Sequence, residues 1–337
     1  MRSNDGGPAM DVSFDRRKIL TPVRLRELAQ RSDWRGWAQA LSHFGAIALT
    51  GAMMGQFWDS WLIIPIFMAH GVLINFLYAG QHELSHGTPF QTKAINEWLG
   101  RIIGFIVIYP RDFDQIQHFA HHQHTSDWEK DGELAREPYT LGSYLSWTLG
   151  LSYWQTRIAR VFRLARGVVV EPYIRPDQHA KVIFEARMHL ALYALLAVGS
   201  VMLQSWALVL YWLAPMLLMK WVHQLQNTIE HLGLEHSNDI MTNTRSTATN
   251  ALMRWMCWQM QYHTAHHMFP SVPFWKLKEL NAAIEEGAGQ PHRMGYLEFQ
   301  WQVIRALTGG RTEADYPSHE VWIVPRANGA AMRLPAE

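Results

Sequence analysis

Histidine is the residue type whose number and spacing in this chain could do chemistry. The 337 residues include 18 histidines but only one cysteine, Cys257. Nine of the histidines lie in four short segments: HELSH at 82–86, HFAHH at 118–122, NTIEH at 227–231 and HTAHH at 263–267. Neutral imidazole is a favoured ligand of zinc, copper, iron and nickel. The four segments therefore predict a transition-metal site.

The spacing of these histidines favours two metal ions over one. Residues at i, i+3 and i+4 share one face of a helix, so His118 can point toward a common centre with His121 or His122. Adjacent residues on a helix point about 100° apart, so a His-His pair reaches two neighbouring ions more easily than it chelates one. The candidate metal ligands are His82, His86, His118, His121, His122, His231, His263, His266 and His267.

Iron suits this ligand set better than zinc. Nine imidazoles exceed the four ligand positions of a tetrahedral zinc site, whereas two iron ions could share them. Soluble di-iron enzymes built on a four-helix bundle use Glu and Glu-x-x-His ligands, a carboxylate pattern that this sequence lacks. Polar neighbours are expected to orient the imidazoles through the ring nitrogen that does not face the metal. The candidates for that role are Glu83, His124, Asp127, Asp131, Glu230 and His236.

Two other functions remain open for the same histidines. HELSH matches the HExxH signature of zinc proteases, in which the glutamate is a general base, but a zinc site there would leave the other clusters unexplained. A membrane metal transporter or sensor would place its ligands inside the spanning helices. Only His43 and His70 fall deep in apolar segments, with His189 nearer an end, and ordinary packing is expected for all three.

The apolar segments that must position the clusters are long enough to cross a membrane. The stretches 36–58 and 60–82 carry no charged residue, and each could cross roughly 30 Å of hydrocarbon as a helix. The uncharged run 188–219 is longer than one such helix needs, so it predicts a second hairpin with spans at about 188–204 and 206–226. The predicted fold class is all-α and integral to the membrane, with four transmembrane helices as two hairpins and a cytoplasmic helical cap that carries the histidine boxes.

Charge asymmetry predicts which side of the membrane the metal site faces. The segment before the first span contains many basic residues, among them Arg16 and Lys18, whereas the tips of both hairpins lack lysine and arginine. By the positive-inside tendency, both termini and the metal site are expected in the cytoplasm. The predicted parts of the chain are a cytoplasmic N-terminal segment 1–35, a membrane domain 36–300 and a C-terminal tail 301–337.

The remaining composition limits the partners. The formal net charge of +1 offers no bulk attraction to a polyanion, so no nucleic-acid partner is expected. A chain with one cysteine cannot hold an iron–sulfur cluster of its own, so the electrons for any redox reaction must come from another protein.

The segment 144–166 mixes aromatic residues with Arg157, Arg160, Arg163 and Arg166, which predicts a helix on an anionic membrane surface.

These motifs resemble those of the membrane fatty acid desaturase and hydroxylase family. The three histidine boxes of that family correspond to HELSH, HFAHHQHTSDWEKD and YHTAHHMFPSVP, and NTIEHLG is similar to its Asn-x-x-x-His element. The resemblance covers roughly residues 60–300. It implies that the nine histidines bind two ferrous ions, that Asn227 holds an iron-bound water, and that O2 is a co-substrate.

The resemblance also implies a reaction. It is the O2-dependent desaturation or hydroxylation of an unactivated C–H position in a fatty acyl or lipid-like substrate, with an electron donor of the ferredoxin, rubredoxin or cytochrome b5 type and its reductase. The first box has three intervening residues, where several acyl-CoA desaturases have four, and no fused cytochrome b5 pattern is present. The wider family also oxidises small polar molecules, so oxygenation of a small non-lipid metabolite is the alternative.

Overall fold

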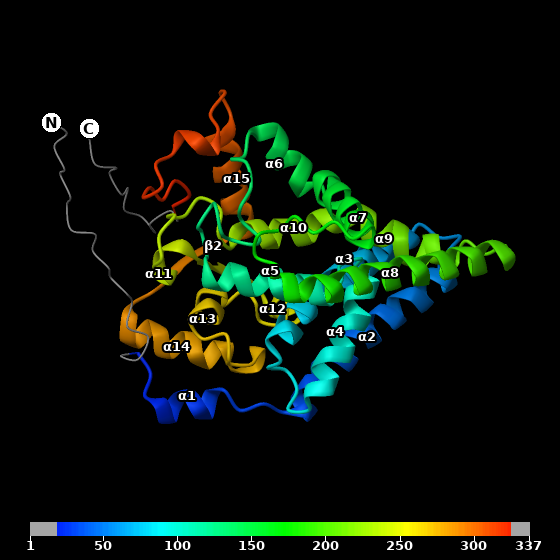
Figure 1. Ribbon diagram of the computed structural model, residues 1–337, viewed down its shortest axis with the longest axis horizontal. Helices are drawn as coiled ribbons and strands as arrows, with labels where there is room; N and C mark the ends of the chain where they lie inside the picture. The colour runs from blue at the N-terminus through cyan, green and yellow to red at the C-terminus, as the bar shows by residue number, and fades with distance from the viewer. Residues whose placement is uncertain (1–18, 325–337) are drawn as a thin grey trace.

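A computed structural model describes residues 19–324 of the chain. In this range the protein consists almost entirely of helices (Figure 1), and a long arm of helices points away from a broader assembly that we call the cap. The arm contains α2 (Asp33–Gln56), α3 (Ile63–His86), α4 (Lys93–Ile106), α8 (Pro176–Met202), η2 (Val209–Leu213) and α9 (Ala214–Leu218).

The cap is built from short helices and one small sheet. Its strands β1 (Arg245–Ala248) and β2 (His292–Gly295) pair in parallel. Its helices are α1 (Pro22–Leu28), α5 (Arg111–Gln123), α6 (Leu141–Thr148), α7 (Leu151–Ala165), α10 (Lys220–Ile229), α11 (Ile240–Asn243), α12 (Ala251–Met256), α13 (His263–Met268), α14 (Leu277–Ala288) and α15 (Tyr296–Leu307), with 3-10 turns η3 (Phe274–Lys276) and η4 (Glu313–Asp315).

The first predicted hairpin corresponds to α2 and α3, which pack against each other. Ser32 begins α2 by accepting a hydrogen bond from the backbone N–H of Arg35. Gly87 ends α3 with a positive φ of 65°, a conformation that glycine adopts without strain. Because α3 continues to His86, beyond the predicted end of the span at residue 82, the first histidine box lies on the C-terminal end of a long apolar helix.

The helix α8 is longer than the span predicted for it. The prediction placed a span at 188–204, whereas α8 begins at Pro176 and ends at Met202. Proline suits the first turn of a helix, and Gln178 bonds back to the backbone N–H of Arg175 at 3.0 Å. The first part of the uncharged run, residues 188–202, is therefore the C-terminal part of a longer helix. Of the described residues, α3 and α8 are the helices long and apolar enough to cross a bilayer.

The predicted span 206–226 is not one regular helix. It consists of the π-helical turn η2, then α9, and then α10 after a break at Met219. Pro215 has no N–H to donate to the carbonyl of Tyr211 four residues earlier, and His70 Nε2 lies 2.8 Å from that oxygen instead. His70 thus satisfies a backbone group that the proline leaves open, which is the packing role expected for it.

The segment 144–166 differs from its prediction as a membrane-surface helix. It forms two helices, α6 and α7, separated by Gly150 with a φ of 83°. The guanidinium carbon of Arg157 lies 3.2 Å from the centre of the Tyr109 ring, and Arg160 also stacks on an aromatic ring. These two arginines point into the protein, so the surface prediction is wrong for them.

The described part of the predicted tail 301–337 packs against the cap. The tail was predicted to begin at residue 301, which lies inside α15. Ile323 is buried, its N–H lies 3.2 Å from the carbonyl of Gly233, and its own carbonyl accepts a hydrogen bond from Arg245 Nη2 at 2.9 Å. Arg16 and Lys18, which contributed to the predicted orientation, lie outside the described residues.

Close packing of α3 on α9 requires a small residue at position 71. A Cβ atom added to Gly71 would overlap with the carbonyl oxygen of Pro215 and come within 2.7 Å of Met219 Cγ. We expect Gly71→Ala to destabilise the protein by about 1–3 kcal/mol, because an extra methyl group in a packed interface forces the helices apart. Thermal unfolding in detergent measures the effect. Gly45→Ala is the matched control, since a Cβ on Gly45 meets nothing within 4 Å, and equal unfolding temperatures would contradict the prediction.

Candidate metal centre

The nine candidate histidines meet in two groups. They lie on α3, α5 and α13 and directly after α10, and Figure 1 shows where these helices are in the fold. The ring nitrogens of each group lie within 4.8 Å of one another. The first group contains His82, His86, His118, His122 and His266, and the second group contains His121, His231, His263 and His267. Four segments that are distant in the sequence therefore converge at one place.

The nitrogen atoms of the first group face one another. Nε2 of His118 lies 2.8 Å from that of His86 and 3.0 Å from that of His122. Nε2 of His82 lies 2.8 Å from that of His266. Two imidazole nitrogens bound side by side to one ion at roughly 2.1 Å are about 3 Å apart. The donor type and the spacing therefore fit a transition-metal ion with nitrogen ligands.

The second group has the same character. Nε2 of His231 lies 2.7 Å from that of His263, and the ring centres of His121 and His267 are 4.8 Å apart. Nε2 of His267 is buried without a hydrogen-bond partner in the protein, which leaves its lone pair available to a ligand. Burial lowers the pKa of His231 to about 3, so this imidazole stays in the neutral form that binds metals.

Adjacent histidines divide between the two groups. His121 and His122 belong to different groups, and so do His266 and His267. The ring centres are 5.9 Å apart in both pairs. This division follows from the angle between neighbouring residues on a helix, which is the angle on which the prediction of two ions was based.

A turn after α5 places two carboxylates behind the histidines of that helix. Both oxygens of Asp131 lie 2.9 Å from His121 Nδ1, and Glu133 Oε1 lies 2.8 Å from His118 Nδ1. Asp131 also accepts hydrogen bonds from the backbone N–H groups of Ser126 and Glu133, so it fixes the turn. Burial favours the neutral form of His121, but the charges of Asp131 and Glu133 outweigh it and raise the pKa to about 9. The sequence predicted Asp131 as an orienting residue and missed Glu133, whose position depends on this turn.

Glu83, the glutamate of HELSH, lies behind an imidazole rather than in front of the site. Its Oε1 is 3.4 Å from His266 Nδ1. Its Oε2 accepts hydrogen bonds from the Thr88 hydroxyl at 3.2 Å and from the Phe274 N–H at 3.1 Å. The general base of a zinc protease must reach a metal-bound water, and Glu83 is held away from such a position. This arrangement disfavours the zinc-protease alternative.

The other predicted orienting residues divide into one that reaches the site and three that do not. Glu230 Oε1 lies 3.5 Å from His263 Nδ1 in the second group. Asp127 instead caps a surface turn by accepting backbone N–H bonds. His236 lies beside a tryptophan ring with centres 4.6 Å apart. His124 follows the last turn of α5 and belongs to neither group of residues 19–324.

The histidines inside the apolar segments are bonded within the protein. His43 Nε2 lies 2.9 Å from the carbonyl of Leu73, and its Nδ1 accepts a hydrogen bond from the Trp258 indole at 3.1 Å. His70 Nδ1 lies 2.8 Å from the Thr50 hydroxyl. These contacts are those of packed histidines, and they disfavour an ion pathway through the arm.

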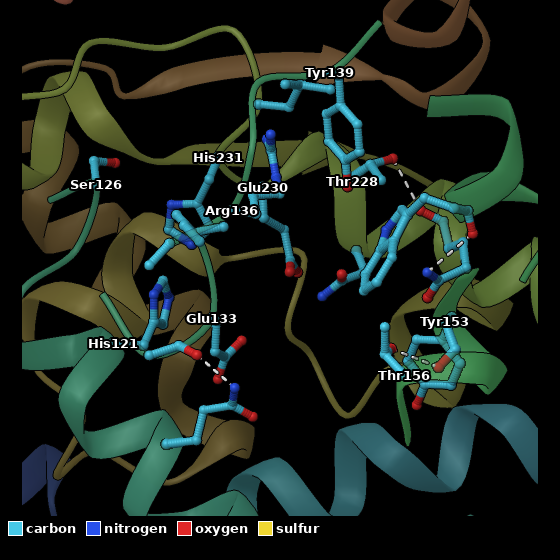
Figure 2. A pocket seen from close by; sticks show the side chains of 18 of the residues that line it. His121, Ser126, Glu133, Arg136, Tyr139, Tyr153, Thr156, Thr228, Glu230 and His231 are labelled. Carbon is cyan, nitrogen blue, oxygen red and sulfur yellow. Dashed lines mark hydrogen bonds between the residues drawn. The ribbon is translucent and has the colours of Figure 1, made fainter. Parts of the chain in front are cut away.

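A cavity of about 310 Å³ lies beside the second group. Figure 2 shows His121 and His231 on one side of the hollow, with Tyr153 and Thr156 across from them. Asn227, which the family resemblance assigns to an iron-bound water, lines the same cavity. A substrate therefore has room to approach the second group from this side.

Comparison with known proteins identifies the family to which this site belongs. The family model described as fatty acid desaturase matches residues 58–300, which is most of the chain and includes all nine histidines. The chain belongs to the fatty acid desaturase family. It is therefore an oxidoreductase, and its two groups of histidines are the candidate metal centre of a desaturase-family enzyme.

Individual desaturases are distant in sequence but similar along most of the chain. The sn-1 oleoyl-lipid 12-desaturase of Synechocystis is 20% identical and aligns with 91% of this chain and 90% of its own length. The sn-1 acyl-lipid omega-3 desaturase (ferredoxin) of the same organism is 24% identical and aligns with 71% of this chain and 72% of its own. The sphingolipid delta(4)-desaturase of Drosophila melanogaster is 24% identical and aligns with 67% of each chain.

The contact between Asp131 and His121 generates a prediction about metal binding. We expect Asp131→Ala to weaken Fe²⁺ binding at the second group by roughly 10–100-fold, because the imidazole loses the partner that fixes its orientation. The measurement is the iron retained per chain after dialysis against a series of chelator concentrations. Asp127→Ala is the matched control, since that carboxylate lies close in sequence but only caps a surface turn. Equal retention by the two variants would contradict an orienting role for Asp131.

Proposed function

We propose that this protein is an O2-dependent, non-haem di-iron enzyme of the membrane that desaturates a fatty acyl substrate. The observation that carries the proposal is the convergence of nine imidazoles into two groups at the end of a long apolar helix. Membership of the fatty acid desaturase family supports the reaction class. Hydroxylation at the same C–H position is the other outcome of this chemistry, and analysis of the product separates the two.

Each group of imidazoles would hold one iron ion. The first ion would be bound by His82, His86, His118, His122 and His266, and the second by His121, His231, His263 and His267. Asn227 would complete the second position through a water molecule, and its place in the wall of the adjoining cavity supports this role. The second group, with four imidazoles, faces the cavity in which a substrate would lie.

With two ferrous ions bound to these residues, the site would supply, together with O2, the oxidising power needed to break an unactivated C–H bond. In desaturation, two hydrogen atoms leave adjacent carbons. With O2, two electrons from a donor and two protons, the products are one double bond and two water molecules. Asp131 and Glu133 orient the imidazoles of His121 and His118, and a substrate in the cavity would have its two reacting carbons beside the second group. Small errors in that placement change rates strongly.

The relatives support the substrate and donor of the proposal. Those named as acyl-lipid desaturases support a fatty acyl lipid as the substrate. One name contains the word ferredoxin, which supports a donor of that type with its reductase, ahead of a rubredoxin or cytochrome b5. A single cysteine, Cys257, cannot hold an iron–sulfur cluster, which supports a separate protein as the source of the electrons.

The proposed arrangement is a multi-pass membrane domain, residues 36–300, with both termini and the metal site in the cytoplasm. Four spans would be formed by α2, α3, α8 and the segment from η2 into α10, and α3 and α8 meet the length and hydropathy needed. Trp61 and Trp206 are exposed at the tips of the two hairpins, as expected for tryptophan at a membrane interface. Arg24 and Arg26 lie on α1, at the opposite end of α2 from the first tip.

Loss of one imidazole from either group should abolish turnover. His266→Ala removes a ligand of the first group and His121→Ala one of the second, and we expect neither variant to form product although both remain inserted in the membrane. The assay is mass spectrometry of products after expression with ferredoxin and its reductase, with and without O2, alongside metal analysis. About two iron ions per chain are expected in the wild type, because each group offers enough ligands for one ion.

The control for these variants is His319→Ala, which changes an exposed histidine. It should retain wild-type activity and iron. Near-normal activity of either ligand variant would refute its assignment, and one zinc ion per chain in place of iron would favour the protease.

Cysteine accessibility tests the orientation. Gln204→Cys lies at the tip of the second hairpin and Glu320→Cys lies in the cap, and both positions are exposed. In intact cells, a membrane-impermeant maleimide should label only Gln204→Cys, with Glu320→Cys reacting after permeabilisation, because the positive-inside tendency places the cap in the cytoplasm. The native Cys257 is buried and gives a low background. Labelling of Glu320→Cys in intact cells would reverse the proposed orientation.

A further inference from the structure

The cavity beside the imidazoles has a cationic side. Arg157 and Arg160, one turn apart on α7, both line it. Figure 2 shows Tyr153 of the same helix across the hollow from His121. The Nη1 atom of each arginine is buried and has no hydrogen-bond partner within the protein. Buried polar groups are almost always paired, so two such atoms beside one cavity call for an acceptor that the cavity would hold.

Neither arginine has its buried Nη1 atom paired with a carboxylate. The guanidinium of Arg157 lies 4.7 Å from the centre of the Tyr153 ring, and Lys220 Nζ lies 3.9 Å from the same ring. In the described part of the chain no carboxylate pairs with Arg157, and Arg160 reaches Glu171 only through Nε at 3.7 Å. Burial lowers the pKa of Arg157 to about 9, so the group remains charged at neutral pH.

The carboxylates of the cavity wall do not neutralise this side. Three of them line the cavity, those of Glu133, Glu230 and Glu313. Each is directed at a partner other than the two arginines. Glu133 lies 2.8 Å from His118, Glu230 lies 3.5 Å from His263, and Glu313 lies 2.6 Å from Arg136. The α7 side of the cavity therefore carries the charge of Arg157, which no carboxylate of residues 19–324 pairs with, and the free Nη1 atom of Arg160, which Glu171 reaches only through Nε.

We propose that Arg157 and Arg160 form a subsite for an oxyanion of the substrate, a carboxylate or a phosphate group. The inference rests on the proposed function, since it names the class of substrate that lies in the cavity beside the second group. Guanidinium groups bind oxyanions through paired, charge-assisted hydrogen bonds. A fatty acid with a free carboxylate or a lipid with an anionic headgroup meets this requirement, and an uncharged fatty alcohol does not.

The test compares an anionic with a neutral probe of the same chain length. Decanoate and decanol are titrated into the iron-loaded protein in phosphatidylcholine nanodiscs, and binding is followed by thermophoresis. We expect the wild type to bind decanoate about tenfold or more tightly than decanol, because hydrogen bonds to charged groups are roughly twice as strong as neutral ones. Arg157→Gln and Arg160→Gln should each remove most of this preference by weakening decanoate binding alone. Arg157→Lys, which keeps the charge, should retain part of it.

Arg166→Gln is the matched control, because Arg166 is exposed at the end of the same helix, and it should keep the full preference. Equal affinity of the wild type for the two probes would overturn the proposal without any variant having to fold. A parallel loss of decanoate and decanol binding in both glutamine variants would show a packing role and would also overturn it.

Two further arms separate the sources of the oxyanion and the two proposals. Displacement of decanoate by phosphatidylglycerol in the nanodisc would support the subsite with a headgroup phosphate as its ligand, and failure to displace it would support the subsite with a free acid. The preference between probes needs no turnover. A preference for decanoate without any oxidised product would support the subsite and contradict the desaturase function. Product formation without a preference for decanoate would support the desaturase function and contradict the subsite.

Discussion

Nine imidazoles share a buried volume. In each ring, the nitrogen that faces away from the other imidazoles needs a hydrogen-bond partner to fix the orientation of the ring, and this requirement governs the structure around them. His121 and His118 obtain their partners from Asp131 and Glu133, and His231 from the carbonyl of Asn243 at 3.0 Å. Eight of the nine histidines lie on helices, and His231 lies in the turn after α10. Asp131 and Glu133 come from the turn after α5, and Asn243 is the last residue of α11. The turn after α5 is therefore part of the site, since it supplies the hydrogen bonds that orient two imidazoles.

The same helix serves both the arm and the metal centre. The long apolar part of α3 packs against α2 and α9, and its last residues carry the first histidine box. The contact of Gly71 with Pro215 and the bond from His70 to the carbonyl of Tyr211 fix α3 against the irregular helix beside it. An error in the packing of the arm would therefore move the imidazoles of His82 and His86 directly, because no flexible linker separates them.

The cavity beside the second group combines two environments. One wall is formed by neutral or paired groups around His231 and Asn227, and the α7 side carries two arginines whose buried Nη1 atoms have no hydrogen-bond partner in the protein. A purely apolar acyl chain would need no such charge, and keeping it buried is costly unless a partner is present. The cavity is thus suited to a molecule with an anionic group on one side and a reactive C–H bond near the imidazoles on the other.

The sequence by itself determined the elements of the site whose geometry is local. The i, i+4 spacings and the paired histidines predicted the nine imidazoles that gather in two groups, and the uncharged runs predicted the apolar helices α3 and α8, because helix periodicity and hydropathy act within a few residues. Tertiary structure decided what depends on distant segments: which imidazole joins which group, the contact of Glu133 with His118, and the inward turn of Arg157. These depend on a turn and on helix packing that bring together residues far apart in the chain, and no local pattern encodes such contacts.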